Sequence, residues 1–205
     1  MSAKREMTTS ATAPGTGGML AWPRQHEGPA DAPPVPSGPG RILVGGVGYT
    51  NLRGRSLGPL LIERLQARTW PPDVVVDDVS YGPIDVLFKL QAELRGFRLG
   101  IFVSAVARGR PEGTIERTVW HSATPSVDEL QERIAEAVTG VVSMENLLHI
   151  LDHFGALPTT TVVIEVEPEA EESWGPELSS LVQAALEQVE ALVFDEVTVA
   201  TVSGA

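Results

Sequence analysis

The stretch Arg41 to Gly58, RILVGGVGYTNLRGRSLG, contains an expected strand, a loop with several glycines and the start of a helix. An apolar run over residues 42–44 precedes three glycines, and a polar loop follows them. After Gly58 the chain continues as PLLIERLQ, in which apolar residues recur at the helical period. In an open α/β sheet, the loop after the first strand usually lies beside a ligand or substrate. The residues in this loop therefore decide the functional interpretation.

The composition is that of one globular domain preceded by a polar segment. The chain has 205 residues, of which 42% are hydrophobic, and this length suits one domain with a sizeable core. Residues 1–39 are rich in Pro, Gly, Ala, Ser and Thr. We expect a disordered tail there, because such a segment buries too little apolar surface to offset its ordering entropy. The domain is then predicted to span residues 40–195, with a C-terminal tail at 196–205.

Charge and cysteine content disfavour several classes of function. The net charge of −12 argues against a nucleic-acid-binding protein, because phosphate binding needs clustered Lys and Arg. The absence of cysteine removes disulfides, thiolate metal sites and a cysteine nucleophile. The sequence shows neither a long apolar run typical of a membrane span nor a secretory signal. A cytoplasmic protein is expected.

The hydrophobic pattern predicts strands that alternate with helices. Strands are expected at about 41–47, 73–78, 98–105 and 159–167, and helices at about 57–68, 84–95, 126–139, 143–154 and 177–193. The alternating stretch TIERTVW, which follows the turn RGRPEG, is expected to be an edge strand. This order predicts an α/β fold with a mostly parallel sheet of about five strands, one antiparallel edge strand and helices on both faces.

A Rossmann-like nucleotide-binding module is one alternative for the first loop. The dinucleotide fingerprint G-x-G-x-x-G is matched by Gly46 and Gly48, but Asn51 stands at the third position. Asp77 or Asp78 matches the acidic residue that ends the second strand. The helix begins about eight residues after Gly48, which places its N-terminus poorly for a pyrophosphate. A simpler explanation of the glycines is a tight turn that needs positive φ.

Two histidines lie one helical turn apart, at His149 and His153. This spacing places both imidazoles on one face, where they could hold a metal, but no HExxH motif and no third ligand accompany them. Their apolar surroundings favour a half-buried packing role for one histidine. The other is then expected at the C-terminal end of the helix, where its charge interacts favourably with the helix dipole.

Other catalytic patterns receive little support. No G-x-S-x-G motif is present. Asp77 and Asp78 point to opposite faces of their strand, so they do not share a proton. The acidic run EPEAEE at 167–172 is interpreted as a solvated loop.

The order of the segments resembles the nickel-iron hydrogenase maturation proteases. The segments are GGVGYTNLRGRSLGPLLIERL, VVVDDVSYGPIDVL, GIFVSAVARGRPEGTIER, SMENLLHILDHFGALP and TVVIEVEPE with WGPELSSLVQAALEQV. The resemblance implies a three-layer α/β/α sandwich. It also implies a protease that clips a C-terminal peptide from a hydrogenase large subunit once the nickel-iron centre is loaded. Members of the family recognise the nickel of the substrate through three side chains, so a hydrogenase large subunit or a related assembly protein is the expected partner.

The resemblance assigns residues to the three metal-ligand positions. In the first loop the family has a carboxylate pair, whereas this chain has Gly54 and Arg55. At the end of the third strand the family has Asp, and this chain has Ser104. In the Ser-x-His motif that begins the fourth helix, Glu145 replaces the His. Tyr49 replaces an Asn that follows the glycines in the family.

These substitutions imply a cleft that is poorly suited to nickel. A nitrogen and oxygen site for nickel needs neutral imidazole and carboxylate ligands, whereas Arg55 remains a cation and Ser104 is a weak neutral ligand. We hypothesise that Arg55 and Glu145 form an ion pair across the cleft. Asp78, in an altered turn after the second strand, and His149, one turn beyond Glu145, are expected as neighbours. A rearranged site that uses Glu145 and His149 is the less favoured alternative.

The leading hypothesis is a degenerate homologue of the maturation proteases that binds a partner during maturation of the large subunit. It assigns no catalytic residue, no cofactor and no metal to the chain, and it expects a monomer. The first alternative is an active endopeptidase that trims the C-terminus of the large subunit, because cleavage in the family is not assigned to one nucleophile. The nucleotide-binding module is the second alternative.

Overall fold

The computed structural model describes residues 40–122, 125–170 and 174–203, and the predicted tail at 1–39 lies outside this part of the chain. The strands are β1 (Arg41–Val47), β2 (Val74–Asp78), β3 (Phe97–Ala105), β4 (Ile115–Val119) and β5 (Thr160–Val166). The helices are the short 3-10 helix η1 (Arg53–Ser56), α1 (Leu57–Gln66), α2 (Pro83–Gln91), α3 (Val127–Val138), α4 (Met144–His153) and α5 (Ser180–Ser203).

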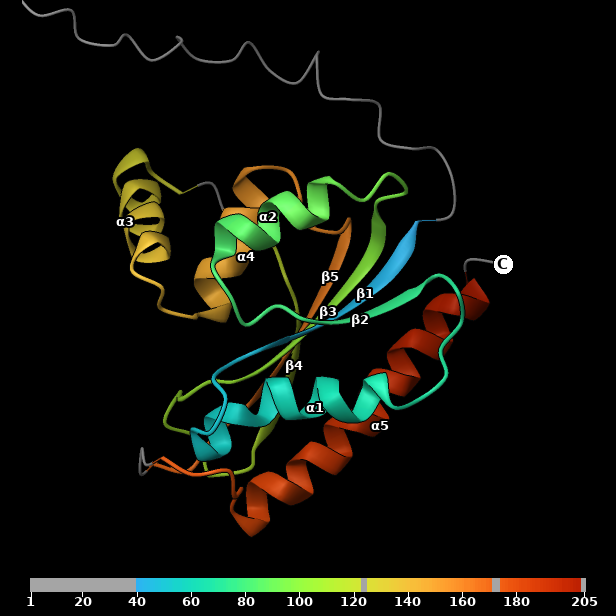
Figure 1. The fold of residues 1–205 in the computed structure, drawn as a ribbon, viewed down its shortest axis with the longest axis vertical. Coiled ribbons are helices and arrows are strands. Elements are labelled where there is room, and N and C mark those ends of the chain that lie inside the picture. Colours follow the sequence, from blue (N-terminus) through green and yellow to red (C-terminus); the bar gives the residue numbers. More distant parts are fainter. Residues whose placement is uncertain (1–39, 123–124, 171–173, 204–205) are drawn as a thin grey trace, which may run out of the picture. The chain divides into compact units, whose positions relative to one another are not determined.

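The strands form one five-stranded sheet in the order β2-β1-β3-β5-β4. All pairs are parallel except β4 with β5, which is antiparallel. Helices α1 and α5 cover one face of the sheet, and α2 and α4 cover the other (Figure 1). The predicted three-layer α/β fold with an antiparallel edge strand is therefore confirmed.

Both faces of the sheet are buried, which explains the nearly continuous apolar runs of the central strands. Side chains of a strand alternate between faces. In β1, Ile42 and Val44 pack toward α1 and α5, whereas Leu43 packs toward α2 and α4. Parallel strands that are covered on both sides are typically rich in Val, Ile and Leu. The change of direction in strand order falls between β1 and β3, where ligands of open α/β sheets usually bind.

The last helix is longer than the sequence pattern predicts. Residues 196–203, expected as part of a C-terminal tail, continue α5 to Ser203. Val197 is only 3% exposed and belongs to the same apolar cluster as α1. This packing overrides the strand-like composition of VTVATV. Although α5 has 24 residues, neither it nor any other described helix is long and apolar enough to cross a membrane.

The ends of α3 and α4 agree with their predicted caps. The Ser126 hydroxyl accepts from the backbone N–H of Glu129, whose carboxylate in turn accepts from the Ser126 N–H, as in a capping box. At α4, the Ser143 hydroxyl accepts from the backbone N–H of Asn146. These caps fix where α4 begins, and the first turn of α4 contributes to the candidate site.

Candidate functional site

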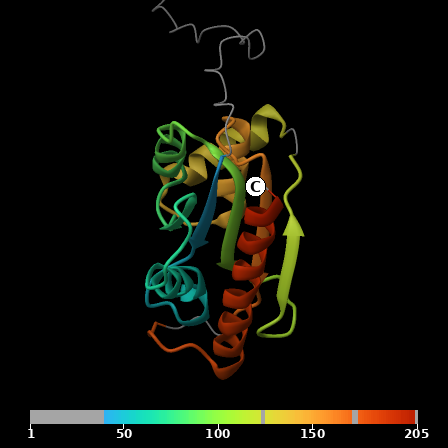
Figure 2. The same cartoon turned by 90° about the vertical axis from the view of Figure 1, so that its right-hand side faces the viewer.

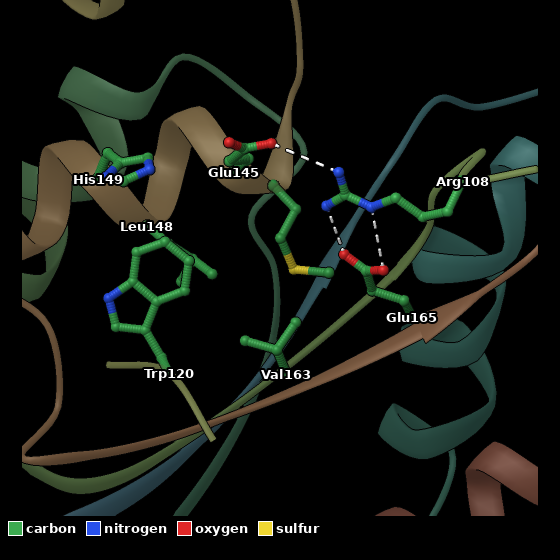
Figure 3. Close-up of a pocket in the computed structure, with 8 residues that line it drawn as sticks. Arg108, Trp120, Glu145, Leu148, His149, Val163 and Glu165 are labelled. Carbon is green, nitrogen blue, oxygen red and sulfur yellow. Dashed lines mark hydrogen bonds and ion pairs between the residues drawn. The ribbon is translucent and has the colours of Figure 1, made fainter. Parts of the chain in front are cut away.

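A cavity of about 270 Å³ lies between α4 and the sheet (Figure 3). The first two turns of α4, strand β5, the turn after β3 and the residue after β4 supply its walls. The lining residues are Arg108, Trp120, Met144, Glu145, Leu148, His149, Val163 and Glu165. The polar groups of Arg108, Glu145 and Glu165 lie at one end, and the indole and aliphatic side chains lie at the other (Figure 3).

Arg108 joins the two carboxylates of the cavity. Its Nη2 and Nε atoms donate to the two oxygens of Glu165, at 2.8 and 3.3 Å, and its Nη1 lies 3.7 Å from Glu145 Oε2. The hydrogen bonds to Glu165 raise the pKa of Arg108 despite partial burial. Burial favours a higher pKa for Glu165, but the hydrogen bonds from Arg108 and Arg110 outweigh it and lower that pKa. Glu165 is therefore held as a carboxylate.

Glu167 anchors the turn that carries both arginines. Its carboxylate accepts from the backbone N–H groups of Arg108 and Gly109, at 2.9 and 3.0 Å, and from Arg110 Nε at 3.2 Å. Burial opposes ionisation of this group, but these donors prevail and its pKa is lowered. Only 5% of Glu167 is exposed. The interpretation of 167–172 as a solvated loop is therefore wrong at Glu167, because the arginine-containing turn folds over it.

Glu145, at the position of the family's histidine ligand, is paired with two cations. Besides its contact with Arg108, its Oε1 accepts from Arg133 Nη2 of α3 at 3.2 Å. The side chain is 43% exposed and projects from the first turn of α4, where the helix dipole also favours a negative charge. The sequence did not identify Arg108 or Arg133 as partners of Glu145.

The glycines of the first loop allow a close approach of α1 to β1. A Cβ atom at Gly58 would lie 2.3 Å from the carbonyl oxygen of Val47, and one at Gly46 would lie 2.5 Å from the carbonyl oxygen of Gly58. A Cβ at Gly48 would lie 2.5 Å from the carbonyl oxygen of Arg55. None of these three glycines adopts a positive φ. The predicted tight turn with positive φ is therefore wrong, and packing is the reason for glycine.

The positive φ angles of this loop occur at Asn51 and Arg53, at 58° and 45°. Asn51 stands where the dinucleotide fingerprint requires its third glycine, and Asn is among the residues that tolerate this conformation best. The segment is held by Gly175, whose N–H donates to the Asn51 carbonyl and whose carbonyl accepts from the Arg53 N–H. The surrounding structure therefore fixes an uncommon backbone conformation in the first loop.

A carboxylate of the chain occupies the start of η1. Glu169 accepts from the backbone N–H of Gly54 at 3.0 Å and from Arg53 Nε at 3.2 Å. A Cβ atom at Gly54 would lie 2.0 Å from Glu169 Oε2. Glu169 therefore already binds the N–H group that an external anion at the start of this helix would need. It is also the second residue of the acidic run that is not solvated, because only 12% of its side chain is exposed.

Two predicted cleft neighbours have structural contacts. The Tyr49 hydroxyl accepts from the backbone N–H of Val142 at 3.0 Å, which ties the first loop to the segment before α4. Asp78 accepts from the backbone N–H of Ser80 at 2.9 Å, and the Ser80 hydroxyl accepts from the Gly48 N–H. Both residues therefore help to position the loops around the site.

Of the three predicted ligand positions, only Glu145 is among the residues that line the cavity. Glu145 lines the cavity together with His149, whereas Arg55 lies in η1 and Ser104 is buried at the end of β3, with only 4% exposed. Ser104 is the cross-strand neighbour of Glu165, so the buried end of β3 adjoins the cavity. These residues do not fit a nickel ion, because one is a cation, one is a buried neutral hydroxyl and one is already bound by arginines. Among the described residues, no group of three His, Asp or Glu side chains is arranged to hold a metal.

The two histidines of α4 have the environments that the sequence favoured. His149 is partly buried and makes an edge-to-face contact with Trp120, with 5.0 Å between ring centroids. His153 is exposed in the last turn of the helix and contacts Phe154 edge-on. Trp120 is also held by Asp152, to which its indole N–H donates at 3.4 Å. The predicted half-buried packing of one histidine is therefore confirmed for His149, and the other, His153, lies at the C-terminal end of the helix as expected.

Solved structures with a similar fold include several hydrogenase maturation proteases. A hydrogenase 2 maturation peptidase from a Thaumarchaeota archaeon is 25% identical, with 76% of this chain and 97% of that chain covered at a TM-score of 0.53. The hydrogenase maturating endopeptidase HybD from E. coli is 24% identical, with 76% and 93% covered at 0.55. The NiFe hydrogenase maturation protease HycI from Thermococcus kodakarensis is 21% identical, with 80% and 96% covered at 0.53.

These matches confirm the resemblance to the maturation proteases at the level of the fold. No protein-family model matches the sequence, and no curated protein does. The similarity to known proteins is therefore one of fold, and the chemistry of the site depends on the residues that line it.

Proposed function

We propose that this chain is a homologue of the hydrogenase maturation proteases that binds a hydrogenase large subunit in the cytoplasm as a monomeric accessory protein, without recognising nickel. The observation that supports the proposal is the pairing of Glu145 with two arginines. At the position where the resemblance expects a histidine ligand, the chain has a carboxylate bound by Arg108 and Arg133. The similarity of the fold to that of the proteases, together with the pairing of Glu145 with two arginines, supports binding without recognition of nickel.

The charges of this network oppose a metal ion. A divalent cation at Glu145 would have to displace two guanidinium groups or lie beside them. Arginine does not lose its proton in a protein, so this repulsion persists at any physiological pH. Glu165 is engaged through both oxygens by Arg108 and Arg110 and offers no free carboxylate. The cavity is therefore suited to a partner that brings no metal to it.

The proposal is tested with a purified hydrogenase large subunit that carries its C-terminal extension, in nickel-loaded and nickel-free forms. We expect this chain to bind both forms with similar affinity and to leave the extension intact, as measured by calorimetry and by mass spectrometry of the large subunit. HybD from E. coli, with its own substrate, is the positive control for trimming. Loss of the extension at a rate comparable to HybD would refute the proposal, and so would binding that requires nickel.

An active endopeptidase is the second candidate, and the observation that favours it is the fold shared with named peptidases. A similar fold does not establish that this chain catalyses the same reaction. Mass spectrometry of the large subunit therefore tests this candidate as well. If trimming occurs, variants Glu145→Gln and Glu165→Gln separate a role in cleavage from a role in binding. A catalytic role lowers the rate of trimming while affinity is unchanged.

A further inference from the structure

Helix α3 is attached to the rest of the domain mainly through α4. Both views place it beside α4 and on the opposite side of the sheet from α1 and α5 (Figure 1 and Figure 2). Of its 12 residues only Ala137 is buried, and Leu130 and Ile134 are partly buried. These three residues recur at the helical period and form one narrow apolar stripe. The helix therefore buries less apolar surface than α4 does.

Polar side chains supply the directional contacts between α3 and α4. Within the described part of the chain, two hydrogen bonds join α3 to another element. Arg133 Nη2 donates to Glu145 Oε1 at 3.2 Å, and the Arg133 carbonyl accepts from Asn146 Nδ2 at 3.1 Å. Both side chains of the ion pair are partly exposed, so the pair contributes little free energy. Separating α3 from α4 therefore costs less than opening the apolar core.

Asn146 has a buried acceptor without a hydrogen bond at this contact. The residue is completely buried, and among the described residues nothing donates to its Oδ1 atom. The amide lies at the interface, because its Nδ2 atom bonds to α3. A buried polar atom without a partner costs free energy, and contact with water removes this cost. The buried amide therefore favours separation of the two helices.

The connection between the two helices contains a hinge at Gly140. This residue is exposed and has a φ of 80°, and a Cβ atom there would meet nothing within 4 Å. Glycine adopts such backbone angles at no steric cost. Two residues later, the Val142 N–H donates to the Tyr49 hydroxyl, which fixes the chain on the α4 side of the hinge. Helix α3 is capped by its own neighbours Ser126 and Thr139, so its ends do not depend on α4.

We propose that α3 is a hinged arm that swings away from α4 about Gly140 in the folded protein and exposes the α4 face that carries Glu145 and Asn146. Glu145 lines the cavity and is paired with Arg108 and Arg133. Opening of the arm removes Arg133 and leaves Arg108, so the position of α3 controls the charge at this side of the cavity. The inference does not rest on the proposed function, because it depends only on how α3 is held.

The chain contains no cysteine, so single-cysteine variants measure the opening directly. Ala137→Cys places a thiol between α3 and α4, whereas Ala185→Cys places one in the apolar core under α5. Val138→Cys, at a position that is 79% exposed, gives the reaction rate of an accessible thiol on the same helix. In the full chain, we expect a thiol reagent to label Ala137→Cys about tenfold or more faster than Ala185→Cys, and more slowly than Val138→Cys.

Low concentrations of urea distinguish opening of the arm from unfolding of the domain. Opening exposes little surface, so the labelling rate of Ala137→Cys should be nearly constant below the unfolding transition, whereas that of Ala185→Cys should rise. Hydrogen exchange of the native chain is the test without a substitution, and the Ile134 amide should exchange faster than the Leu148 amide of α4. Equal labelling rates with the same urea dependence for the two buried thiols would overturn the proposal. Equal protection of the two amides would do so too, as would labelling of Ala137→Cys as fast as Val138→Cys.

The ion pair between Arg133 and Glu145 is expected to hold the arm closed. In the Ala137→Cys background, Arg133→Gln should raise the labelling rate about threefold, the effect of losing a partly exposed ion pair. Glu132→Gln, on the exposed face of the same helix, is the matched control and should change the rate by less than about 1.5-fold. Neither substitution should alter the labelling of Ala185→Cys. An unchanged rate in Arg133→Gln, or an equal rise in both variants, would contradict an arm held by this pair.

Discussion

Glu167 is expected to be a main contributor to the stability of the site, and replacing it tests the charge network directly. The variant Glu167→Ala removes the acceptor of the Arg108 and Gly109 backbone N–H groups. Arg110 keeps Glu165 and Glu116 as partners, so the loss falls mainly on the two backbone donors. At about 1.5 kcal/mol for each hydrogen bond to a charged acceptor, we expect a loss of about 3 kcal/mol.

The assay is urea denaturation of the full chain at pH 7, followed by tryptophan fluorescence. With a slope of about 2 kcal/mol/M, a loss of about 3 kcal/mol lowers the midpoint by about 1.5 M. Glu116→Ala is the matched control, because Glu116 pairs with the same Arg110 but is 53% exposed. Its expected loss is below about 0.5 kcal/mol. Equal midpoints for the two variants would refute the assignment of Glu167 as the anchor of the turn.

The pH dependence of stability is a second test of the role of Glu167. Because the folded-state pKa of Glu167 lies below its ordinary value, its contribution is fully present above the unfolded-state pKa, near pH 4.3. It is lost as the pH falls through the lower folded-state pKa. The difference in stability between the native chain and Glu167→Gln should therefore be constant from pH 7 to about pH 5 and shrink below about pH 4. A difference that is the same at pH 3 and pH 7 would contradict an ionised, hydrogen-bonded Glu167.

Two further predictions concern the first loop and the ligand positions. Gly58→Ala should lower the free energy of unfolding by about 3 kcal/mol or more in the same denaturation assay, because its Cβ atom would lie 2.3 Å from the β1 backbone. Gly82→Ala is the control and should cost less than about 1 kcal/mol, because its Cβ atom would come only to 3.4 Å from a side-chain oxygen of Asp85. The triple variant Arg55→Glu, Ser104→Asp, Glu145→His should show nickel binding by calorimetry while the native chain shows none, because it restores the three family ligands. Tight nickel binding by the native chain would overturn our account of these residues.

The sequence predicts the sheet well because each strand depends on local patterns. The β-branched runs and the alternation in TIERTVW are sufficient to place β4 as an antiparallel edge. The end of α5 could not be predicted in this way. Val197 lies in a β-like stretch, and only its burial against the rest of the core makes a helix favourable there.

The candidate site is predicted in part. Resemblance identified Glu145, but its partners depend on tertiary structure, since Arg133 is 12 residues away and belongs to a different helix. Arg108 and Glu165 are 57 residues apart. A signal was nevertheless present, because two arginines in the turn after β3 and two glutamates at the end of β5 must meet at the same end of parallel strands. Glu167, the first residue of the acidic run, is buried by this pairing, so the run is not a solvated loop throughout.

The contact between Gly54 and Glu169 also limits how this chain can change. Gly54 stands where the resemblance expects one member of the family's carboxylate pair, and a Cβ there would overlap Glu169 Oε2. A side chain at position 54 therefore requires the Glu169 carboxylate to move, and the N–H of residue 54 then loses its acceptor. The residues at positions 54 and 169 are accordingly expected to be coupled, so that the cost of a side chain at position 54 falls when Glu169 is replaced by a shorter residue.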